Sequence, residues 1–427
     1  MTEENAKLLA IVQDGAVPAG YTKVWHLMPE EWKDVPLSYI FTKKNQKNKG
    51  NSVKTVFTNS AVNGIIPQSE YFEKDIANSE NTEGYFVVDP LDYVYNPRIS
   101  ENAPYGPFKR NDTGITGIVS PLYTVLTPRK EFCESEFLHY YLESAQWHKY
   151  AYSIANYGAR FDRMNITDDE LMRLPIAWPS LAEQERIAEI LMQCDKVIEL
   201  KQKRIEEEKK KKIWLYRRIL TGKTRLKGYE TPWVETTIGE QVEYLVGYPF
   251  ESASFFNDGI KLLRGSNVKR GNLSWGTDIT AYWSEDSSIS DYLCQEGDIV
   301  IAMDGAQVGR SFSRIGNNDL PCYLVQRVAR LRSNINGLIV QWIGGSRFAR
   351  HIDQRKTSTA IPHMTIKDIL SYEISIPTDE KEIEHISQLL NQQDQFIDLL
   401  EKEMNELCNR KASLAKLLLT GIVRTKV

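Results

Sequence analysis

The feature that most constrains the fold is a long helical stretch that occurs twice. Residues 181–222, shifted by 199 positions, fall on residues 380–421 without a gap, so that Glu183 matches Glu382 and Asp195 matches Asp394. Both stretches end in Leu-Thr-Gly. A repeat of this length indicates that one structural unit is present in two copies.

Apolar residues recur three and four positions apart in both stretches, which is the spacing of a coiled-coil seam. A helix of about forty residues is on the order of 60 Å long, so it predicts a spacer between globular parts. A helix packed on one core is the alternative, but neither stretch has the broad apolar face of such a helix. The residues predicted to pair the helices or dock other subunits are Ile187, Leu191, Ile198, Ile205, Leu215, Ile386, Leu390, Ile397, Leu400, Leu407 and Leu414.

The middle of the first helix is charged. Lys201, Glu208 and Lys212 fall on the predicted seam. A charge run is most often only a solvated face, but here the seam itself carries charge. We therefore expect the pairing at these positions to be polar or open to water.

Composition sets further limits. A chain of 427 residues with 41% hydrophobic and 26% charged residues is typical of a globular protein with two or three domains. The net charge of −4 means that any nucleic-acid contact must be local. The five cysteines lie far apart without metal-ligand spacing, and no apolar run approaches the roughly 20 residues of a membrane span. These observations predict a soluble, cytoplasmic protein without a metal site.

Short β-rich runs surround the helices and predict an α+β fold. In the first half, strands are expected at 53–57, 85–88, 115–119 and 123–126 and a helix near 135–147; in the second, strands at 260–263, 297–302 and 325–331 and a helix near 338–351. The expected boundaries are 1–30 for a lead-in, 31–179 and 229–377 for two globular mixed α/β domains, and 180–228 and 378–427 for two long antiparallel spacer helices. The repeat predicts a pseudo-two-fold arrangement.

The edges of the two globular domains match, while their middles do not. Trp32 corresponds to Trp233 and Met164 to Met364, whereas the intervening sequences barely align. One scaffold with two different binding surfaces is the simplest interpretation, and different surfaces imply different ligands.

Catalytic motifs are missing from the sequence. The run at 222–224 ends like a phosphate-binding loop but lacks its first glycine and preceding strand, and Asn96-Pro97-Arg98 lacks the second proline and aromatic residue of an amino-methyltransferase motif. There is no His-Glu-x-x-His and no Gly-x-Ser-x-Gly. We expect no catalytic residue, metal or cofactor in this chain.

Local basic character is the remaining signal. Nine Arg and Lys residues face three acids between 301 and 360, and five lysines with no acid lie between 41 and 60. Such stretches suit a phosphate backbone, although any single cation is more often an ordinary surface charge or ion pair. The DNA-binding candidates are Lys43, Lys44, Lys47, Lys54, Arg98, Lys109, Arg110, Arg160, Arg264, Lys269, Arg270, Arg310, Arg314, Arg327 and Arg347.

Together these features resemble the specificity subunit of type I restriction-modification systems. The resemblance covers nearly the whole chain and is carried by the repeat, by Leu-Thr-Gly at both helix ends, and by Leu-Ala-Glu-Gln-Glu-Arg-Ile at 181–187. The second helix departs from the Glu-Gln pattern, since it reads Glu382-Ile383.

The resemblance implies two target-recognition domains, each reading one half of a split, asymmetric double-stranded DNA target, with the paired helices setting the gap. It also implies docking of two modification subunits that bind AdoMet and methylate adenine at N6. Restriction subunits would join them to translocate and cleave DNA with ATP and Mg. Chemistry would then lie on the partners, and this chain would hold no cofactor.

Three rival interpretations remain open at this stage. A subunit of a related methyltransferase-nuclease assembly would share every feature above. A coiled-coil scaffold whose lateral domains bind proteins would show no salt-dependent DNA affinity. An enzyme of unknown type would turn over AdoMet or ATP as the isolated chain.

Overall fold

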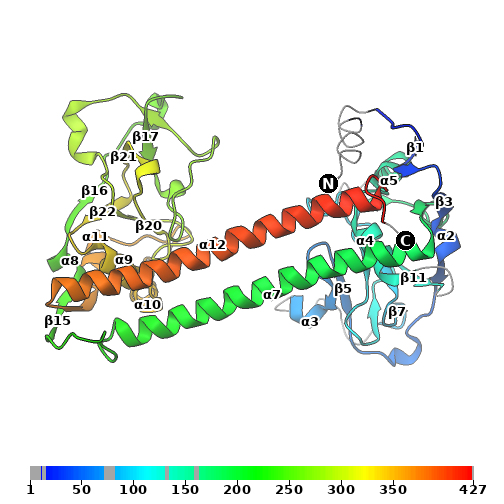
Figure 1. The fold of residues 1–427 in the computed structure, drawn as a ribbon, viewed down its shortest axis with the longest axis horizontal. Helices are drawn as coiled ribbons and strands as arrows, with labels where there is room; N and C mark the ends of the chain where they lie inside the picture. Colours follow the sequence, from blue (N-terminus) through cyan, green and yellow to red (C-terminus); the bar gives the residue numbers. More distant parts are fainter. Residues whose placement is uncertain (1–10, 12–15, 72–81, 130–133, 158–162, 426–427) are drawn as a thin grey trace. The chain divides into compact units, whose positions relative to one another are not determined.

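The computed structural model describes residues 11, 16–71, 82–129, 134–157 and 163–425. The chain divides into two compact units, which are described separately below. Unit 1 comprises Met1–Lys201 and Glu403–Val427, and unit 2 comprises Gln202–Lys402. Two long helices, α7 (Leu181–Ile219) and α12 (Glu380–Leu419), each contribute one half to each unit (Figure 1). The duplicated stretch is thus helical in both copies, as the spacing predicts.

Unit 1 is built around a four-stranded antiparallel sheet of order β4-β11-β8-β9. Its strands are β4 (Phe41–Lys44), β8 (Tyr93–Tyr95), β9 (Phe108–Arg110) and β11 (Thr124–Pro128). Smaller pairs join β1 (Tyr21–Lys23) to β2 (Leu27–Pro29), β3 (Lys33–Pro36) to β14 (Pro175–Trp178), β5 (Phe57–Ser60) to β6 (Gly64–Pro67), β7 (Phe86–Val88) to β10 (Gly117–Val119), and β12 (Asn156–Tyr157) to β13 (Met164–Asn165). The helices are α2 (Leu37–Ile40), α3 (Gln68–Tyr71), α4 (Ser135–Glu143), α5 (His148–Ile154) and α6 (Asp168–Met172).

Unit 2 repeats this plan. Its four-stranded sheet has the order β16-β22-β19-β20, with β16 (Glu243–Val246), β19 (Ile299–Ala302), β20 (Phe312–Arg314) and β22 (Val328–Arg332). A second sheet, β18-β17-β21, contains β17 (Ile260–Leu263), β18 (Tyr282–Trp283) and β21 (Cys322–Leu324), and β15 (Trp233–Thr237) pairs with β23 (Glu373–Pro377). The helices are α8 (Ile238–Gln241), α9 (Asn336–Gly344), α10 (Ser346–Asp353) and α11 (Ile366–Leu370). The shared strand order confirms the internal repeat at the level of topology.

Matching sequence at the domain ends produces matching local structure. Thr167 caps α6 by accepting from the amide of Glu170, whose carboxylate accepts from the amide of Thr167 in return. Thr365 and Asp368 make the same reciprocal bonds at the start of α11. Such a capping box fixes where a helix begins, so both units end in a short helix that leads into the strand before the long helix.

The ends of the long helices belong to the cores of the globular units. In unit 1, Ile187 and Leu191 of α7 and Leu418 of α12 are buried in one cluster with the sheet and with α4. In unit 2, Ile386 and Leu390 of α12 lie in the corresponding cluster with α9 and Ile374. Full burial of one such side chain stabilises a protein by about 1.5–3 kcal/mol. These predicted seam residues therefore also anchor each helix on its own domain.

The helices run antiparallel inside each unit. In unit 1, Lys201 pairs with Glu403 and Lys411 with Asp195. In unit 2, Lys209 pairs with Glu401 at 2.6 Å and Lys212 with Asp394, while Gln393 donates to Glu208 at 2.9 Å. The charged middle of the seam is polar, as its sequence predicts. Ile205, Ile397 and Leu400 are buried, whereas Ile198, Leu215, Leu407 and Leu414 are half-buried.

Several predicted elements begin or end at other residues, such as the strand expected at 325–331, which is β22 (Val328–Arg332). Three of these differences have a local physical cause. The helix expected near 135–147 is shorter, because α4 ends at Glu143, where the Ser144 hydroxyl donates to the carbonyl of Tyr141; the next helix, α5, begins only at His148. The helix expected near 338–351 breaks at Gly345, which is extended. The strand expected at 53–57 begins only at Phe57, since the backbone of Val53 is bound by the side chain of Asn48.

Candidate nucleic-acid interface

Six of the predicted DNA-binding cations are paired with acids inside their own unit. In unit 1, Lys43 pairs with Asp168, Lys44 with Asp89 and Asp92 at 2.6 and 2.7 Å, Lys109 with Glu143 at 2.6 Å, and Arg110 with Asp112 at 2.6 Å and with Glu136. In unit 2, Arg310 pairs with Asp353 and Arg327 with Asp304. These cations are already neutralised, which weakens the prediction that they contact phosphate.

Some of these ion pairs shift the pKa of the groups that form them. Burial acts to lower the pKa of Arg110, but hydrogen bonds to Glu136 and its contact with Asp112 outweigh it and raise the pKa. The pKa of Lys44 is raised in the same way, by Asp89 and Asp92 against burial. The pKa of Asp353 is lowered by hydrogen bonds from Arg310 and Lys356. Each of these ion pairs ties strands and loops together.

Two further candidates bind backbone and aromatic groups. Arg264 donates to the carbonyl of Ile279 and lies over the ring of Phe255. Arg270 donates to the carbonyl of Gly344 at 2.9 Å and lies over Phe312. Arg160 lies outside the described residues.

The remaining six candidates are exposed and form no ion pair with any described residue. They are Lys47, Lys54, Arg98, Lys269, Arg314 and Arg347. Lys49, Arg350 and Arg355 share these properties although they were not among the candidates. Because long-range pairing with acids decides which cations stay free, sequence position alone could not separate the two groups. In each unit, these are the cations whose charge no described acid neutralises.

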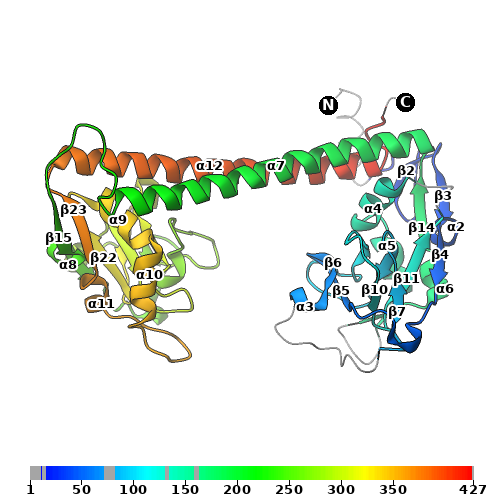
Figure 2. The ribbon, with the colours of Figure 1, turned by 90° about the horizontal axis from the view of Figure 1, so that it is seen from below.

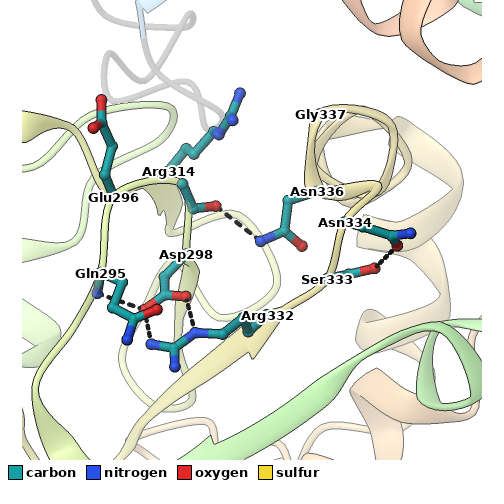
Figure 3. A pocket seen from close by; sticks show the side chains of 10 residues that line it. Gln295, Glu296, Asp298, Arg314, Arg332, Ser333, Asn334, Asn336 and Gly337 are labelled. Carbon is teal, nitrogen blue, oxygen red and sulfur yellow. Dashed lines mark hydrogen bonds and ion pairs between the residues drawn. The ribbon is translucent and has the colours of Figure 1, made fainter.

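A polar pocket of about 170 Å³ in unit 2 also lies near a free cation (Figure 3). Arg332 binds the buried carboxylate of Asp298 through two bonds of 2.7 Å, and Asn336 donates to the carbonyl of Gly297 at 2.8 Å. Arg314 and Glu296 extend away from that ion pair. Asp298 and Arg332 therefore bind each other, and this ion pair holds the start of β19 to β22.

The described ranges contain neither a metal-binding cluster nor a membrane-spanning helix. No three His, Cys, Asp or Glu side chains gather closely enough there to hold a metal ion. None of the helices in that part of the chain is both long and apolar enough to span a bilayer.

Comparisons with known proteins agree with this architecture. The family model described as the type I restriction modification DNA specificity domain matches twice, over residues 29–209 and 219–409. The EcoAI specificity subunit of Escherichia coli is 30% identical over 151 residues, which cover 34% of this chain and 26% of that protein. The MjaVIII specificity subunit of Methanocaldococcus jannaschii is 26% identical over 60% of this chain and 63% of its own length. These curated relatives are thus matched over less than two thirds of their length.

Two solved structures share the fold. One comes from a study of the assembly and conformational transition of the type I R-M system. It matches with a TM-score of 0.58 and 14% identity, and the match covers 93% of this chain and 99% of the solved chain. The S subunit of a type I restriction-modification system from M. genitalium has a TM-score of 0.54 with 14% identity, over 93% of this chain and 96% of its own. With two family matches that span most of its length, this chain belongs to the type I restriction-modification DNA specificity family.

Proposed function

We propose that each globular unit reads one half of a split, asymmetric duplex DNA target, and that α7 and α12 set the gap between the halves. The observation that supports this most is the repeat of one four-stranded sheet order with different loops around it. A shared scaffold gives both readers the same frame, while unlike loops give each its own sequence preference. Free cations in both units would supply the contacts to phosphate.

In this proposal the chain delivers an adenine and its partners carry out the chemistry. Two modification subunits would bind AdoMet and methylate adenine at N6 after extruding it from the stack. Restriction subunits would use ATP and Mg to translocate and cleave DNA. The chain itself would be non-catalytic, which fits the use of its buried acids and bases in structural ion pairs such as Asp298 with Arg332.

Exposed apolar side chains on the long helices support docking of other subunits there. On α7, Val197 and Leu200 lie in unit 1, and Ile213 and Trp214 lie in unit 2. Each of these four is about half exposed. Large apolar groups on an otherwise charged helix are typical of a surface that a partner covers.

A salt titration tests the proposal. The purified complex is added to duplex DNA at rising salt, and the slope of log affinity against log salt is measured. Phosphate contacts predict a steep negative slope, because each contact releases condensed counterions. A flat salt response would contradict DNA binding and favour a scaffold that binds proteins. Methylome sequencing of the source strain then tests whether the methylated target is split.

A further inference from the structure

In the described part of unit 1, the densest group of free cations lies in the connection between β4 and β5. Lys47, Lys49 and Lys54 are exposed and form no ion pair with a described residue, and residues 45–56 contain no acid. Lys43 and Lys44, only a few positions earlier, are both paired with aspartates. The structure therefore divides one lysine-rich stretch into a neutralised strand and a loop whose lysines pair with no described acid.

This loop is held by one buried side chain. Asn48 is fully buried; its Oδ1 accepts from the amide of Val53 at 2.9 Å and from the hydroxyl of Ser52 at 3.3 Å. Its Nδ2 donates to the carbonyl of Val53 at 2.9 Å and to the hydroxyl of Thr82 at 3.3 Å. All polar atoms of the amide thus bind within the loop or its support, so Asn48 fixes the loop that carries the lysines.

A second asparagine completes the support. Asn51 Oδ1 accepts from the amide and the hydroxyl of Thr82, at 3.2 and 2.9 Å. Asn51 and Gly50 have φ values of 51° and 67°, a left-handed turn that asparagine and glycine tolerate better than other residues. The backbone amide of Asn48 also donates to the carbonyl of Tyr85 at 2.9 Å, which ties the loop to the residue before β7.

The loop lies beside β7, at the end of unit 1 opposite α7 (Figure 2). The lysines of this loop therefore lie on a surface that the long helices do not cover. Ordering such a loop before binding removes an entropic cost that would otherwise be met when the ligand arrives.

The equivalent connection in unit 2 differs in charge. Residues 247–259 join β16 to β17, just as residues 45–56 join β4 to β5, and both connections contain one short 3-10 helix. The unit 2 connection has Glu251 and Asp258 and no Lys or Arg. Because the two units share the same strand framework, we attribute the difference in loop charge to a difference in what each unit binds. The basic loop is a feature of unit 1.

We propose that the loop from Lys47 to Lys54 is a pre-ordered contact site for the phosphates of duplex DNA, and that Asn48 is its positioning residue. This rests on the proposed function. Three cations at fixed places on one loop suit the regular spacing of a phosphate backbone, and the fixed loop sets which phosphates they reach. Asn48 itself, being fully buried, acts only through the loop.

The test measures the affinity of the full chain for random-sequence duplex DNA over a range of salt. The variants are Lys47→Gln, Lys49→Gln, Lys54→Gln and all three together. Lys33→Gln is the control, since Lys33 is an exposed lysine of β3 outside the loop. Each single loop variant is expected to make the salt slope less negative by about 0.9, the triple variant by about three times as much, and the control is expected to leave the slope unchanged.

The role of Asn48 is tested by Asn48→Ala in two backgrounds. In the native background it should weaken binding and flatten the salt slope although every lysine is present. In the triple Lys→Gln background it should have no further effect on DNA affinity. Should Asn48→Ala fail to fold, Thr82→Val removes the two bonds that the Thr82 hydroxyl makes with Asn48 and Asn51, and a loss of binding in the same direction is expected.

The outcomes separate this inference from the function it rests on. A flat slope for the native chain would contradict DNA binding altogether. A steep native slope that the loop variants leave unchanged would overturn the phosphate site alone. Equal losses from Asn48→Ala in both backgrounds would show a general structural effect and overturn the positioning role. Binding of an acidic polypeptide but not of duplex DNA by the loop would also overturn the proposal.

Discussion

Arg424 binds the buried carboxylate of Glu183 through two bonds, from Nε to Oε1 at 2.8 Å and from Nη2 to Oε2 at 3.0 Å. Its guanidinium also lies over the ring of Trp32, whose indole donates to Glu183 at 3.1 Å. The end of the chain is thereby fastened to the start of α7. In unit 1 this contact joins three segments that are far apart in sequence.

Unit 2 makes the same contact 199 positions away. Arg225 binds Glu382 at 2.7 and 2.5 Å and lies over Trp233. Here the indole nitrogen of Trp233 is buried and has no hydrogen-bond partner in the described part of the chain, and Glu382 is fully buried. The two sites therefore share geometry but differ in how many groups support the carboxylate.

We predict that Arg225→Met costs more stability than Arg424→Met. Removing the arginine leaves a buried carboxylate without its partner. Among the described residues, Arg225 is the only side-chain donor to Glu382, while Glu183 keeps the indole of Trp32. We expect about 4 kcal/mol for Arg225→Met, and about 2 kcal/mol for Arg424→Met because the Arg424 side chain is 40% exposed. Denaturant unfolding of each unit measures both values; equal losses would contradict the role assigned to Trp32.

Unit 1 should lose stability in mild acid because of His26. Burial lowers the pKa of His26 to about 4, so the folded state resists its protonation while the unfolded state accepts a proton at about 6.5. The stability that neutral His26 contributes is present above pH 6.5 and is lost as the pH falls toward 4, by about 3 kcal/mol at most. Measuring the unfolding free energy of unit 1 from pH 7.5 to 4.5 checks this.

The neighbours of His26 define the control. Asp34 lies 3.9 Å from its Nε2, and the Tyr141 hydroxyl lies 3.5 Å from its Nδ1. Burial raises the pKa of Asp34, so Asp34 stabilises the folded state as the pH falls, opposite to His26. Burial lowers the pKa of His148, so His148 destabilises the folded state as the pH falls, as His26 does. His26→Gln should flatten the profile, and an unchanged profile would show that His26 is not responsible.

Thiol chemistry should report unfolding of unit 2. Cys294 and Cys322 are buried, and the pKa of Cys294 is raised by its hydrogen bond with Cys322 and by burial. Cys408 on α12 is exposed. In a chain carrying Cys133→Ser, alkylation at pH 8 is expected to modify Cys408 at once and the buried pair only when unit 2 unfolds. Early modification of Cys294, read by mass spectrometry, would contradict this packing.

The sequence predicted the features that depend on local periodicity. The seam spacing and the 199-residue repeat predicted α7 and α12, and the charge at Lys201 and Lys212 predicted a polar middle. Helix breaks were missed where a single residue decides the outcome, as at Gly345, whose extended backbone separates α9 from α10.

The free cations of the candidate site could not be identified from the sequence. Lys43 and Lys47 look alike in sequence, but Asp168, which neutralises Lys43, lies 125 positions away. Asn48 has no sequence signal as a positioning residue, because its role depends on Thr82 and on burial. Local pattern indicates that a stretch is basic; only the folded contacts show which of its cations are free.

Lengthening both helices should widen the gap in the DNA target if they set it. Four residues added after Lys201 and four after Lys402 fall at the division between the units, so the pairs Lys201–Glu403 and Lys209–Glu401 each stay within their own unit. One turn adds about 6 Å, against about 3.4 Å per base pair, so we expect one or two extra base pairs with both half-sites unchanged. An insertion in α7 alone is the control, because it shifts the helix register and breaks these pairs. Methylome sequencing reads the result, and an unaltered gap in the doubly extended chain would count against the spacing role.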